Sequence, residues 1–236
     1  MTALFIADLH LSDNTKLLNQ AFSNFVQTTA SKADQLFILG DLFEAWLGDN
    51  DDSVIAGFVA EHLQSLSDNG TQVFLMRGNR DFMLSQRYAQ SIGANLLDDP
   101  ITLEIEGRNI TLLHGDSLCT EDKKYQRFRR IIQHPFTRSL LAKLPLSIRK
   151  KIGQKLRGKS SRENANKSDN IMDVADNTVQ QLFFEQSVKV LVHGHTHRPM
   201  VHEYGDKQRY VLGDWGEKLW FLQLNQQGFE LIQQTL

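Results

Sequence analysis

Five short apolar runs, each followed directly by acidic, amide or imidazole side chains, constrain this chain more than any other feature. The runs occupy residues 4–7, 36–39, 73–76, 110–113 and 188–192. Runs of this length and composition indicate strands buried in the centre of a sheet. Helical patterns at residues 17–26 and 54–66 alternate with them. This alternation predicts an α/β sheet with layered helices.

The C-terminal part has a different pattern. Residues 209–213, 218–224 and 229–232 form closely spaced strand-like runs, which predict an antiparallel β-meander that closes the sheet. Before them, residues 171–184 return to an amphipathic helix, and the polar stretch at 158–170 predicts a loop.

Length and composition favour one domain over residues 1–236. Hydrophobic residues make up 41% of the chain, enough for an ordinary core, and no stretch approaches the roughly 20 apolar residues that a membrane span needs. No leader pattern is present at the N-terminus, so we expect a cytosolic protein. The single cysteine, Cys119, excludes an internal disulfide and points any metal toward nitrogen and oxygen ligands.

Positive charge is concentrated in the middle of the chain. Residues 120–170 hold 15 Lys and Arg against 4 Asp and Glu, a local excess of +11, within a chain whose net charge is −2. Apolar residues recur there at helical spacing, with Pro135 and Pro145 as breaks. We therefore predict a small helical cap, inserted at about residues 122–168, whose basic face is a separate functional surface.

The polar residues after the five runs are the candidate site. They are Asp8 and His10, Asp41, Asn79 to Asp81, His114 to Asp116, and His195 to His197. The carboxyl ends of strands in one sheet would bring all five tips together. An extended backbone would project Asp8 and His10 from one face, and only glycines such as Gly40 and Gly194 would need an unusual backbone.

Taken singly, each motif has an ordinary structural explanation. Asp8-x-His10 could be a surface pair, Gly40-Asp41 and Asn79 could be turns, and His114 could be a satisfied interior histidine. His195-Thr196-His197 is the sharpest signal, since two imidazoles at this spacing can reach neighbouring ions. Because every group follows a strand and offers a hard or borderline donor, the set as a whole predicts metal binding.

The ordered set of motifs resembles the calcineurin-like metallophosphoesterase superfamily over nearly the whole chain. The resemblance implies a four-layer α/β/β/α sandwich that binds two divalent metal ions, Mn²⁺ by preference. It implies Asp8, His10, Asp41 and His197 as ligands of one ion, and Asp41, Asn79, His114 and His195 as ligands of the other. Asp41 would bridge them. Such a pair neutralises phosphoryl oxygens and acidifies a water, which attacks phosphorus in line.

Arg80 departs from many members of the superfamily, which have histidine in Gly-Asn-His-Asp. Arginine cannot protonate a leaving group near neutral pH, but its planar fork binds phosphate oxygens. A phosphate leaving group needs less acid help, so Arg80 favours pyrophosphate cleavage. The structural alternative is a salt bridge to Asp81. The resemblance makes Asp41, Asn79, Arg80 and His195 the catalytic residues, with His193, Asp81 and Asp116 orienting the ligands.

A narrower set of motifs resembles the branch of the superfamily that acts in bacterial lipid A biosynthesis. Residues 40–46, 78–82, 114–116, 120–122, 160–167, 171–174 and 194–199 carry this resemblance. It implies hydrolysis of UDP-2,3-diacylglucosamine by water attack at the α-phosphorus, giving UMP and 2,3-diacylglucosamine 1-phosphate, at the cytoplasmic face of the inner membrane. The implied contacts with this lipid-linked nucleotide sugar are Asn79, Arg80, Asp122, Ser160, Asn164, Lys167 and His195.

Several of these contacts have structural alternatives. Ser160, Asn164 and Lys167 lie in a polar stretch, and Asp122 could cap a helix that begins near Lys123. Weaker candidates for an acyl pocket are Tyr125, Phe128, Ile132, Phe136, Leu141, Ile152, Leu156 and Arg157.

The basic, partly apolar cap suits peripheral contact with an anionic membrane, although its apolar residues could equally form its own small core. A basic face also suits a nuclease, and a dimetal nuclease or cyclic-nucleotide phosphodiesterase is the main alternative. A non-catalytic binding module ranks last, because every motif position is occupied. We expect no nucleic acid and no obligate protein partner.

Overall fold

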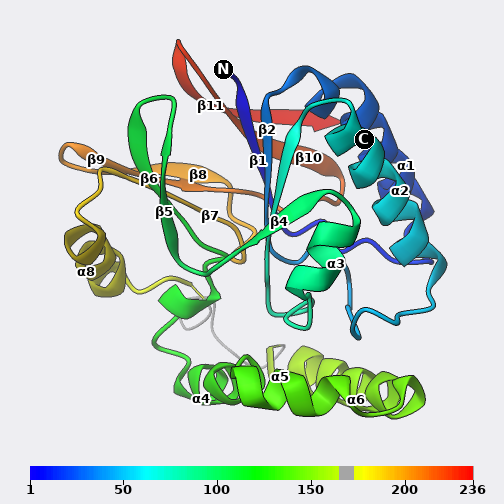
Figure 1. Cartoon of the computed structure of the whole chain (residues 1–236). Coiled ribbons are helices and arrows are strands. Elements are labelled where there is room, and N and C mark those ends of the chain that lie inside the picture. Colours follow the sequence, from blue (N-terminus) through cyan, green and yellow to red (C-terminus); the bar gives the residue numbers. More distant parts are fainter. Residues whose placement is uncertain (165–172, 236) are drawn as a thin grey trace.

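The computed structural model describes residues 1–164 and 173–235 and contains two β-sheets packed face to face (Figure 1). One sheet has six strands, in the order β11 (Gly228–Thr235), β10 (Lys218–Asn225), β1 (Ala3–Ile6), β2 (Gln35–Leu39), β3 (Gln72–Met76) and β4 (Ala94–Leu97). The other has five, in the order β5 (Ile101–Ile105), β6 (Arg108–Leu112), β7 (Val190–His193), β9 (Lys207–Val211) and β8 (Met200–Tyr204).

Parallel pairing occupies the centre of both sheets. The strands β1 to β4 pair in parallel with Leu4 opposite Leu36 and Val73 opposite Leu36, while β10 is antiparallel to β1. In the second sheet β6, β7 and β9 are parallel, and β5 and β8 form antiparallel edges. All the apolar runs found in the sequence are therefore inner strands, which explains why they are apolar on both faces.

Helices cover the outer face of each sheet. On the six-stranded sheet lie α1 (Lys16–Thr28), α2 (Val54–Asp68) and α3 (Gln86–Ser91), and on the five-stranded sheet lies α8 (Asp176–Gln186) (Figure 1). Short 3₁₀ turns are η1 (Ala30–Lys32) and η2 (Asp116–Leu118). The predicted four-layer α/β/β/α sandwich is confirmed.

Successive side chains of a strand point to opposite faces of its sheet, and in this way they fill the three interfaces between the four layers. On β1, Leu4 and Ile6 face α1 and α2, whereas Ala3 and Phe5 face the other sheet. Between the sheets Phe5, Phe37 and Phe74 stack in a row, with ring centroids 5.0 and 4.6 Å apart.

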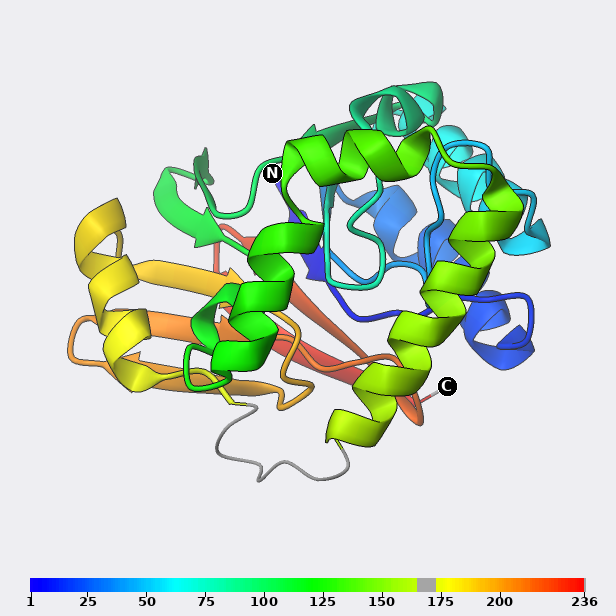
Figure 2. The same ribbon diagram turned by 90° about the horizontal axis from the view of Figure 1, so that it is seen from below.

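Three further helices lie across the ends of the sheets, next to the carboxyl ends of the parallel strands (Figures 1 and 2). They are α4 (Lys123–Ile132), α5 (Pro135–Ala142) and α6 (Leu146–Asn164), and we call them the helical cap. Neither α4 nor α5 buries a residue fully. Among the described residues, no helix combines the length and the apolar character that crossing a bilayer requires.

Several sequence expectations were wrong in detail. The C-terminal runs do not form one meander, because β9 joins the second sheet while β10 and β11 pair in the first. The stretch at 158–170 is not all loop, since α6 continues to Asn164. Of the predicted helix at 171–184, α8 begins only at Asp176, while residues 171 and 172 lie outside the described part. The short strands β4, β5 and β8 were not predicted.

Candidate dinuclear metal centre

The residues predicted to bind metal come from loops of both sheets, and not from one sheet as expected. Asp8, His10, Asp41 and Asn79 follow strands of the six-stranded sheet, whereas His114, His195 and His197 follow strands of the five-stranded sheet. Hydrogen bonds join the sheets here: the His195 amide donates to Asp8 Oδ2 at 2.7 Å, and His114 Nδ1 donates to the Leu39 carbonyl at 2.9 Å. The candidate site thus lies on the seam between the sheets.

Five of the seven predicted ligands have a left-handed backbone. The φ angles are 56° at Asp8, 50° at His10, 51° at Asp41, 69° at His195 and 56° at His197. The expectation of an extended backbone at Asp8 and His10, with unusual angles only at glycines, was therefore wrong. Such conformations cost on the order of 1–3 kcal/mol each and persist where the surrounding structure imposes a functional geometry. The backbone itself marks these loops as functional.

Two glycines allow the carboxylates to approach neighbouring loops. A Cβ atom on Gly78 would lie 2.2 Å from Asp41 Oδ1, and one on Gly194 would lie 2.3 Å from Asp8 Oδ2. Both distances are far inside van der Waals contact. Neither glycine has a positive φ, so close approach, and not backbone freedom, explains the residue type.

One group of donors consists of Asp8, His10 and His197, whose ligand atoms lie within 4.8 Å of one another. His197 Nε2 is 3.4 Å from Asp8 Oδ1 and 3.4 Å from His10 Nε2. On the far side of the rings, Glu44 Oε2 lies 3.6 Å from His10 Nδ1 and Asp214 Oδ2 lies 3.5 Å from His197 Nδ1. A carboxylate behind a metal-binding histidine orients the ring and increases its basicity.

A second group consists of Asp8, Asp41 and His114, again within 4.8 Å. Because His114 Nδ1 donates to Leu39, Nε2 carries the lone pair of the neutral ring. That lone pair faces Asn79 Oδ1 at 3.1 Å and Asp41 Oδ1 at 3.9 Å. Acceptors that converge in this way need a cation or a proton between them.

In the metal-free protein, a proton on His114 supplies the positive charge that these acceptors need, as the pKa values indicate. Burial raises the pKa of Asp41 to about 7. Burial acts to lower the pKa of His114, but the negative charges of Asp41 and Asp8 outweigh it and raise that pKa to about 9. Burial lowers the pKa of His10 to about 3 and that of His195 to about 4, so these imidazoles are neutral, as metal ligands must be.

His195 lies beside the second group and not within it. Its ring centroid is 5.1 Å from that of His114 and 6.1 Å from that of Tyr125, on which it stacks. Asp8 is the carboxylate common to both groups, whereas Asp41 belongs to the second. The roles of Asp41 as bridge and His195 as ligand therefore stay predictions.

Arg80 is built into the same loops. Its amide donates to Asp41 Oδ1 at 2.8 Å, its Nη1 donates to Glu44 Oε1 at 2.7 Å, and its Nε lies 3.8 Å from Asp41 Oδ2. The alternative suggested by the sequence, a salt bridge to Asp81, is not formed among the described residues. Glu44 thus contacts both Arg80 and His10. No role for Glu44 or Asp214 was predicted from the sequence, although Glu44 lies within the run 40–46.

The residues expected to orient the ligands hold the loops together. Asp81 accepts hydrogen bonds from the amides of Gly78 at 2.7 Å and Leu42 at 2.8 Å, which ties two ligand loops to each other. His193 donates to the Gly194 carbonyl at 2.8 Å and accepts from Arg209 at 3.1 Å. Asp81 therefore supports two ligand loops, while the orienting role of His193 stays a prediction.

Asp116 joins the cap to the site. It accepts a hydrogen bond from the Tyr125 hydroxyl at 2.6 Å and lies 2.8 Å from Arg129 Nε, while Arg129 Nη2 reaches Asp99 at 3.0 Å. Since Tyr125 also stacks on His195, α4 is fixed directly against the candidate centre.

Three of the predicted substrate contacts, Asp122, Ser160 and Asn164, lie within the cap or at its start. Asp122 caps α4, accepting a hydrogen bond from the Tyr125 amide at 3.1 Å, as its structural alternative required. Ser160 and Asn164 belong to α6, but their side chains and that of Arg157 are outside the described part, and Lys167 lies wholly outside it. Of the acyl-pocket candidates, Phe128 and Phe136 are exposed, and Ile132, Leu141, Ile152 and Leu156 are half-buried.

The residues present fit a pair of divalent ions. Asp8 Oδ1 is buried and has no hydrogen-bond partner among the described residues, although Asp8 belongs to both clusters of converging donors. Carboxylate, amide and imidazole donors together suit Mn²⁺ and also Fe, Co or Zn.

Comparison with known proteins agrees with the fold and the motifs. Residues 1–199 match the model of the family described as calcineurin-like phosphoesterase. Among solved structures, the chain is similar to an archaeal phosphodiesterase, with 13% identity, a TM-score of 0.51 and full coverage of both chains. It is also similar to a zinc complex of Vps29 from Entamoeba histolytica, with 13% identity, a TM-score of 0.51, and coverage of 100% and 99%. At these identities the likeness shows the fold alone.

Curated sequences are much more similar. The chain is 44% identical to the UDP-2,3-diacylglucosamine hydrolase of Tolumonas auensis, over 100% of this chain and 98% of that protein. It is 43% identical to the protein of the same name from Serratia proteamaculans, over 99% of each. This chain is therefore a member of the calcineurin-like phosphoesterase family, and within it of the group that contains the UDP-2,3-diacylglucosamine hydrolases.

Proposed function

We propose that the protein hydrolyses the pyrophosphate bond of UDP-2,3-diacylglucosamine, giving UMP and 2,3-diacylglucosamine 1-phosphate (lipid X), in lipid A biosynthesis. The observation that carries this proposal is the 44% identity, over the full chain, to a hydrolase named for that substrate. The converging donors on the seam between the sheets supply the chemistry that such a reaction needs.

The proposed centre holds two divalent ions, with Mn²⁺ as our choice. Asp8, His10, Asp41 and His197 would hold one ion, and Asp41, Asn79, His114 and His195 the other. When bound, the pair would neutralise the phosphate oxygens and lower the pKa of a water molecule, which makes that water a better nucleophile. The left-handed loops and the bonds made by Asp81 support this assignment, because they fix the donors before any substrate arrives.

The protein's own residues would orient the substrate. Glu44 accepts a hydrogen bond from Nη1 of Arg80. The remaining N–H groups of the Arg80 guanidinium can therefore bind phosphate oxygens beside Asn79. Water attacks the α-phosphorus, the bond to the bridging oxygen breaks, and the electron pair leaves with 2,3-diacylglucosamine 1-phosphate. A phosphate leaves without a proton donor, which suits Arg80 in a position where a histidine would supply one.

The helical cap would bind the lipid part of the substrate. It lies next to the ends of the parallel strands (Figure 2), and it carries Asp122, Ser160 and Asn164, which we propose, with Lys167, as substrate contacts around the sugar and phosphate. The half-buried Leu141 and Ile152 are candidates for contact with the acyl chains.

Peripheral attachment to the cytoplasmic face of the inner membrane is part of this proposal. The cap exposes large apolar side chains beside many basic ones, including Ile131 at 65%, Phe136 at 71% and Leu140 at 54% exposed. Exposed apolar groups among lysines and arginines favour the surface of an anionic bilayer. Sedimentation with anionic vesicles tests this: Phe136→Ser with Leu140→Ser should reduce binding, and unchanged binding would contradict membrane contact through α5.

The direct test of the reaction uses the Mn²⁺-loaded protein with UDP-2,3-diacylglucosamine in ¹⁸O-water. We expect UMP to form and to carry the label, because the attack is at the α-phosphorus. Asp41→Asn should abolish UMP release, whereas Asp52→Asn, the same change at an exposed surface pair with Lys150, should not. Absence of UMP at micromolar enzyme, or cleavage of nucleic acid or a cyclic diester instead, would refute the proposal.

A further inference from the structure

A cavity that none of the predicted metal ligands lines lies between α5 of the cap and the segment that follows β3. Its volume is about 430 Å³, and residues from 48–50, 77, 83–86 and the cap line it. Three of the lining side chains are guanidinium groups, those of Arg77, Arg138 and Arg149, and Asp49 is the one carboxylate. The cavity therefore has an excess of positive charge.

The three arginines are held in different ways. Arg149 is a structural anchor: its Nε donates to the Leu144 carbonyl at 3.0 Å, and its other nitrogens donate to the Leu47 carbonyl and to Asn50. Arg77 uses only its Nε, which donates to the Leu84 carbonyl at 2.6 Å.

The Arg138 side chain makes no hydrogen bond or ion pair with any described residue, and its Nε is buried without a partner. Burial lowers the pKa of Arg138. Asp98 acts on the pKa of Arg138 in the opposite direction, but Asp98 is exposed. Neither Asp98 nor Asp81 forms an ion pair with Arg77 or Arg138 among the described residues. Two neighbouring guanidinium groups are thus partly desolvated without a counter-ion, which is unfavourable in the absence of an anion.

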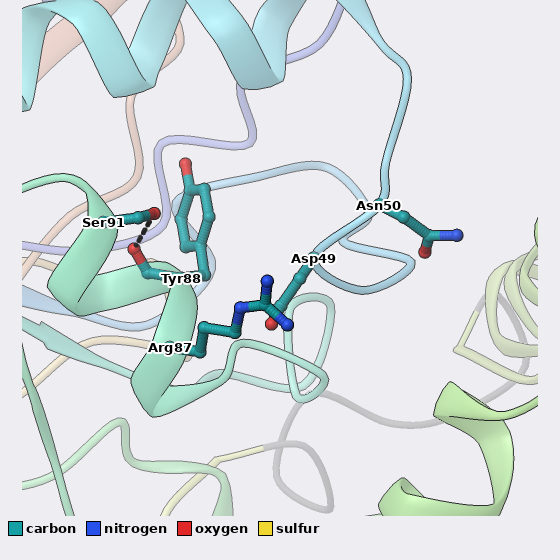
Figure 3. Close-up of a pocket in the computed structure, with 5 residues that line it drawn as sticks. All are labelled: Asp49, Asn50, Arg87, Tyr88 and Ser91. Carbon is teal, nitrogen blue, oxygen red and sulfur yellow. Dashed lines mark hydrogen bonds between the residues drawn. The ribbon is translucent and has the colours of Figure 1, made fainter.

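The one carboxylate does not neutralise them. Asp49 Oδ2 accepts a hydrogen bond from the Ser85 hydroxyl at 2.7 Å, and Asp49 also borders an adjoining cavity of about 320 Å³, drawn in Figure 3. That adjoining cavity has Arg87 as its one guanidinium, against the same carboxylate, so its charges balance. Of these two cavities, only the one lined by Arg77 and Arg138 has an excess of positive charge.

We propose that the cavity between α5 and residues 77–86 binds a phosphate group through Arg77 and Arg138. The planar fork of arginine matches phosphate oxygens in paired hydrogen bonds, and a phosphate supplies the missing negative charge. Two sources offer this chemistry: free phosphate, and the headgroup of an anionic phospholipid. The headgroup is within reach of the same helix, because α5 also exposes Phe136 and Leu140. The site is separate from hydrolysis and does not depend on the proposed reaction.

The test compares three forms of the full-length, Mn²⁺-loaded protein: wild type, Arg77→Gln with Arg138→Gln, and the control Arg130→Gln. Arg130 is an exposed residue of α4 outside the cavity, so its replacement measures the effect of losing one positive charge elsewhere on the cap. Equilibrium dialysis with inorganic phosphate forms one arm, and any binding at the metal centre is common to all three proteins. Sedimentation with vesicles of phosphatidylcholine and phosphatidylglycerol in equal parts, against phosphatidylcholine alone, forms the other.

We expect wild type and Arg130→Gln to bind one phosphate more than the double variant, or the double variant to lose vesicle binding by at least about tenfold. A loss with phosphate assigns the free anion, and a loss with vesicles alone assigns the headgroup. Equal binding by all three proteins in both arms, or an equal loss in Arg130→Gln, overturns the proposal.

Folding of the variants provides a second readout. Arg138→Gln removes a side chain with no hydrogen bond among the described residues and relieves repulsion, so in phosphate-free buffer it should melt no lower than wild type. If the site binds the free anion, phosphate should raise the melting temperature of wild type more than that of this variant. If Arg138→Gln alone melts lower without phosphate and responds to phosphate as wild type does, the guanidinium is structural and the proposal fails.

Discussion

Replacement of Gly78 by alanine tests whether the packing of the ligand loops sets the metal affinity. The new Cβ would lie 2.2 Å from Asp41 Oδ1 and 2.4 Å from the Asp41 backbone nitrogen. Loop movement cannot relieve this easily, since the Asp81 carboxylate bonds the amides on both sides, at Gly78 and Leu42. Overpacking of this kind costs about 1–3 kcal/mol, which lowers the melting temperature of a protein this size by about 2–12 °C.

The same displacement moves the carboxylate that we propose as the bridge. We therefore expect Gly78→Ala to weaken Mn²⁺ binding on the order of 10- to 100-fold, as disturbed support of metal ligands typically does. Calorimetric titration of the metal-free protein with Mn²⁺ measures the affinity, and differential scanning calorimetry measures the stability.

Gly57→Ala is the matched control. Gly57 lies within α2, and an added Cβ there meets no atom within 4 Å. Alanine should stabilise that helix by about 1 kcal/mol and leave Mn²⁺ binding unchanged. If Gly78→Ala keeps the stability and the Mn²⁺ affinity of wild type, the reasoning about the crowded loop is wrong.

Three further predictions concern the same region. Glu44→Gln should lower kcat by about 10- to 100-fold in the UMP-release assay, because it weakens the support of both Arg80 and His10, and a wild-type rate would show that neither depends on it. Dialysis against a chelator should lower the melting temperature and abolish UMP release, with both restored by Mn²⁺; an unchanged melting temperature would argue against ions on the seam. Cys119, which is buried and whose pKa burial raises to about 12, should resist iodoacetamide at pH 8.5 until the protein unfolds, and rapid modification of the folded protein would contradict that burial.

The inner strands were predictable because they are apolar on both faces, a pattern that few other elements share. Residues 36–39 and 73–76 are examples, and they correspond closely to β2 and β3. By contrast, β8 is an exposed edge strand in which Met200 and Val201 face solvent, so its sequence carries no burial signal. The sequence also did not indicate which sheet a strand joins, since β9 and β10 look alike in sequence but pair in different sheets.

In the candidate site, residue identity was predictable and conformation was not. The tips after the strands located Asp8, Asp41 and His114 without any coordinates, and the structure brings these three together. No local pattern predicts a left-handed backbone at His10 or His197, because tertiary contacts impose it. Supporting residues such as Asp214 could not be predicted from a sequence pattern either, since only the fold brings Asp214 to His197.

The position of the donors on the seam has a consequence for assembly of the protein. Asp8 and Asp41 are ordered by one sheet and His114 and His197 by the other, so neither half alone offers either complete set of proposed ligands. An ion bound there would act as a cross-link between two parts of the chain that are nearly 190 residues apart at His10 and His197. Metal loading would then report that both sheets have docked, and a chain with one sheet formed would remain both empty and inactive.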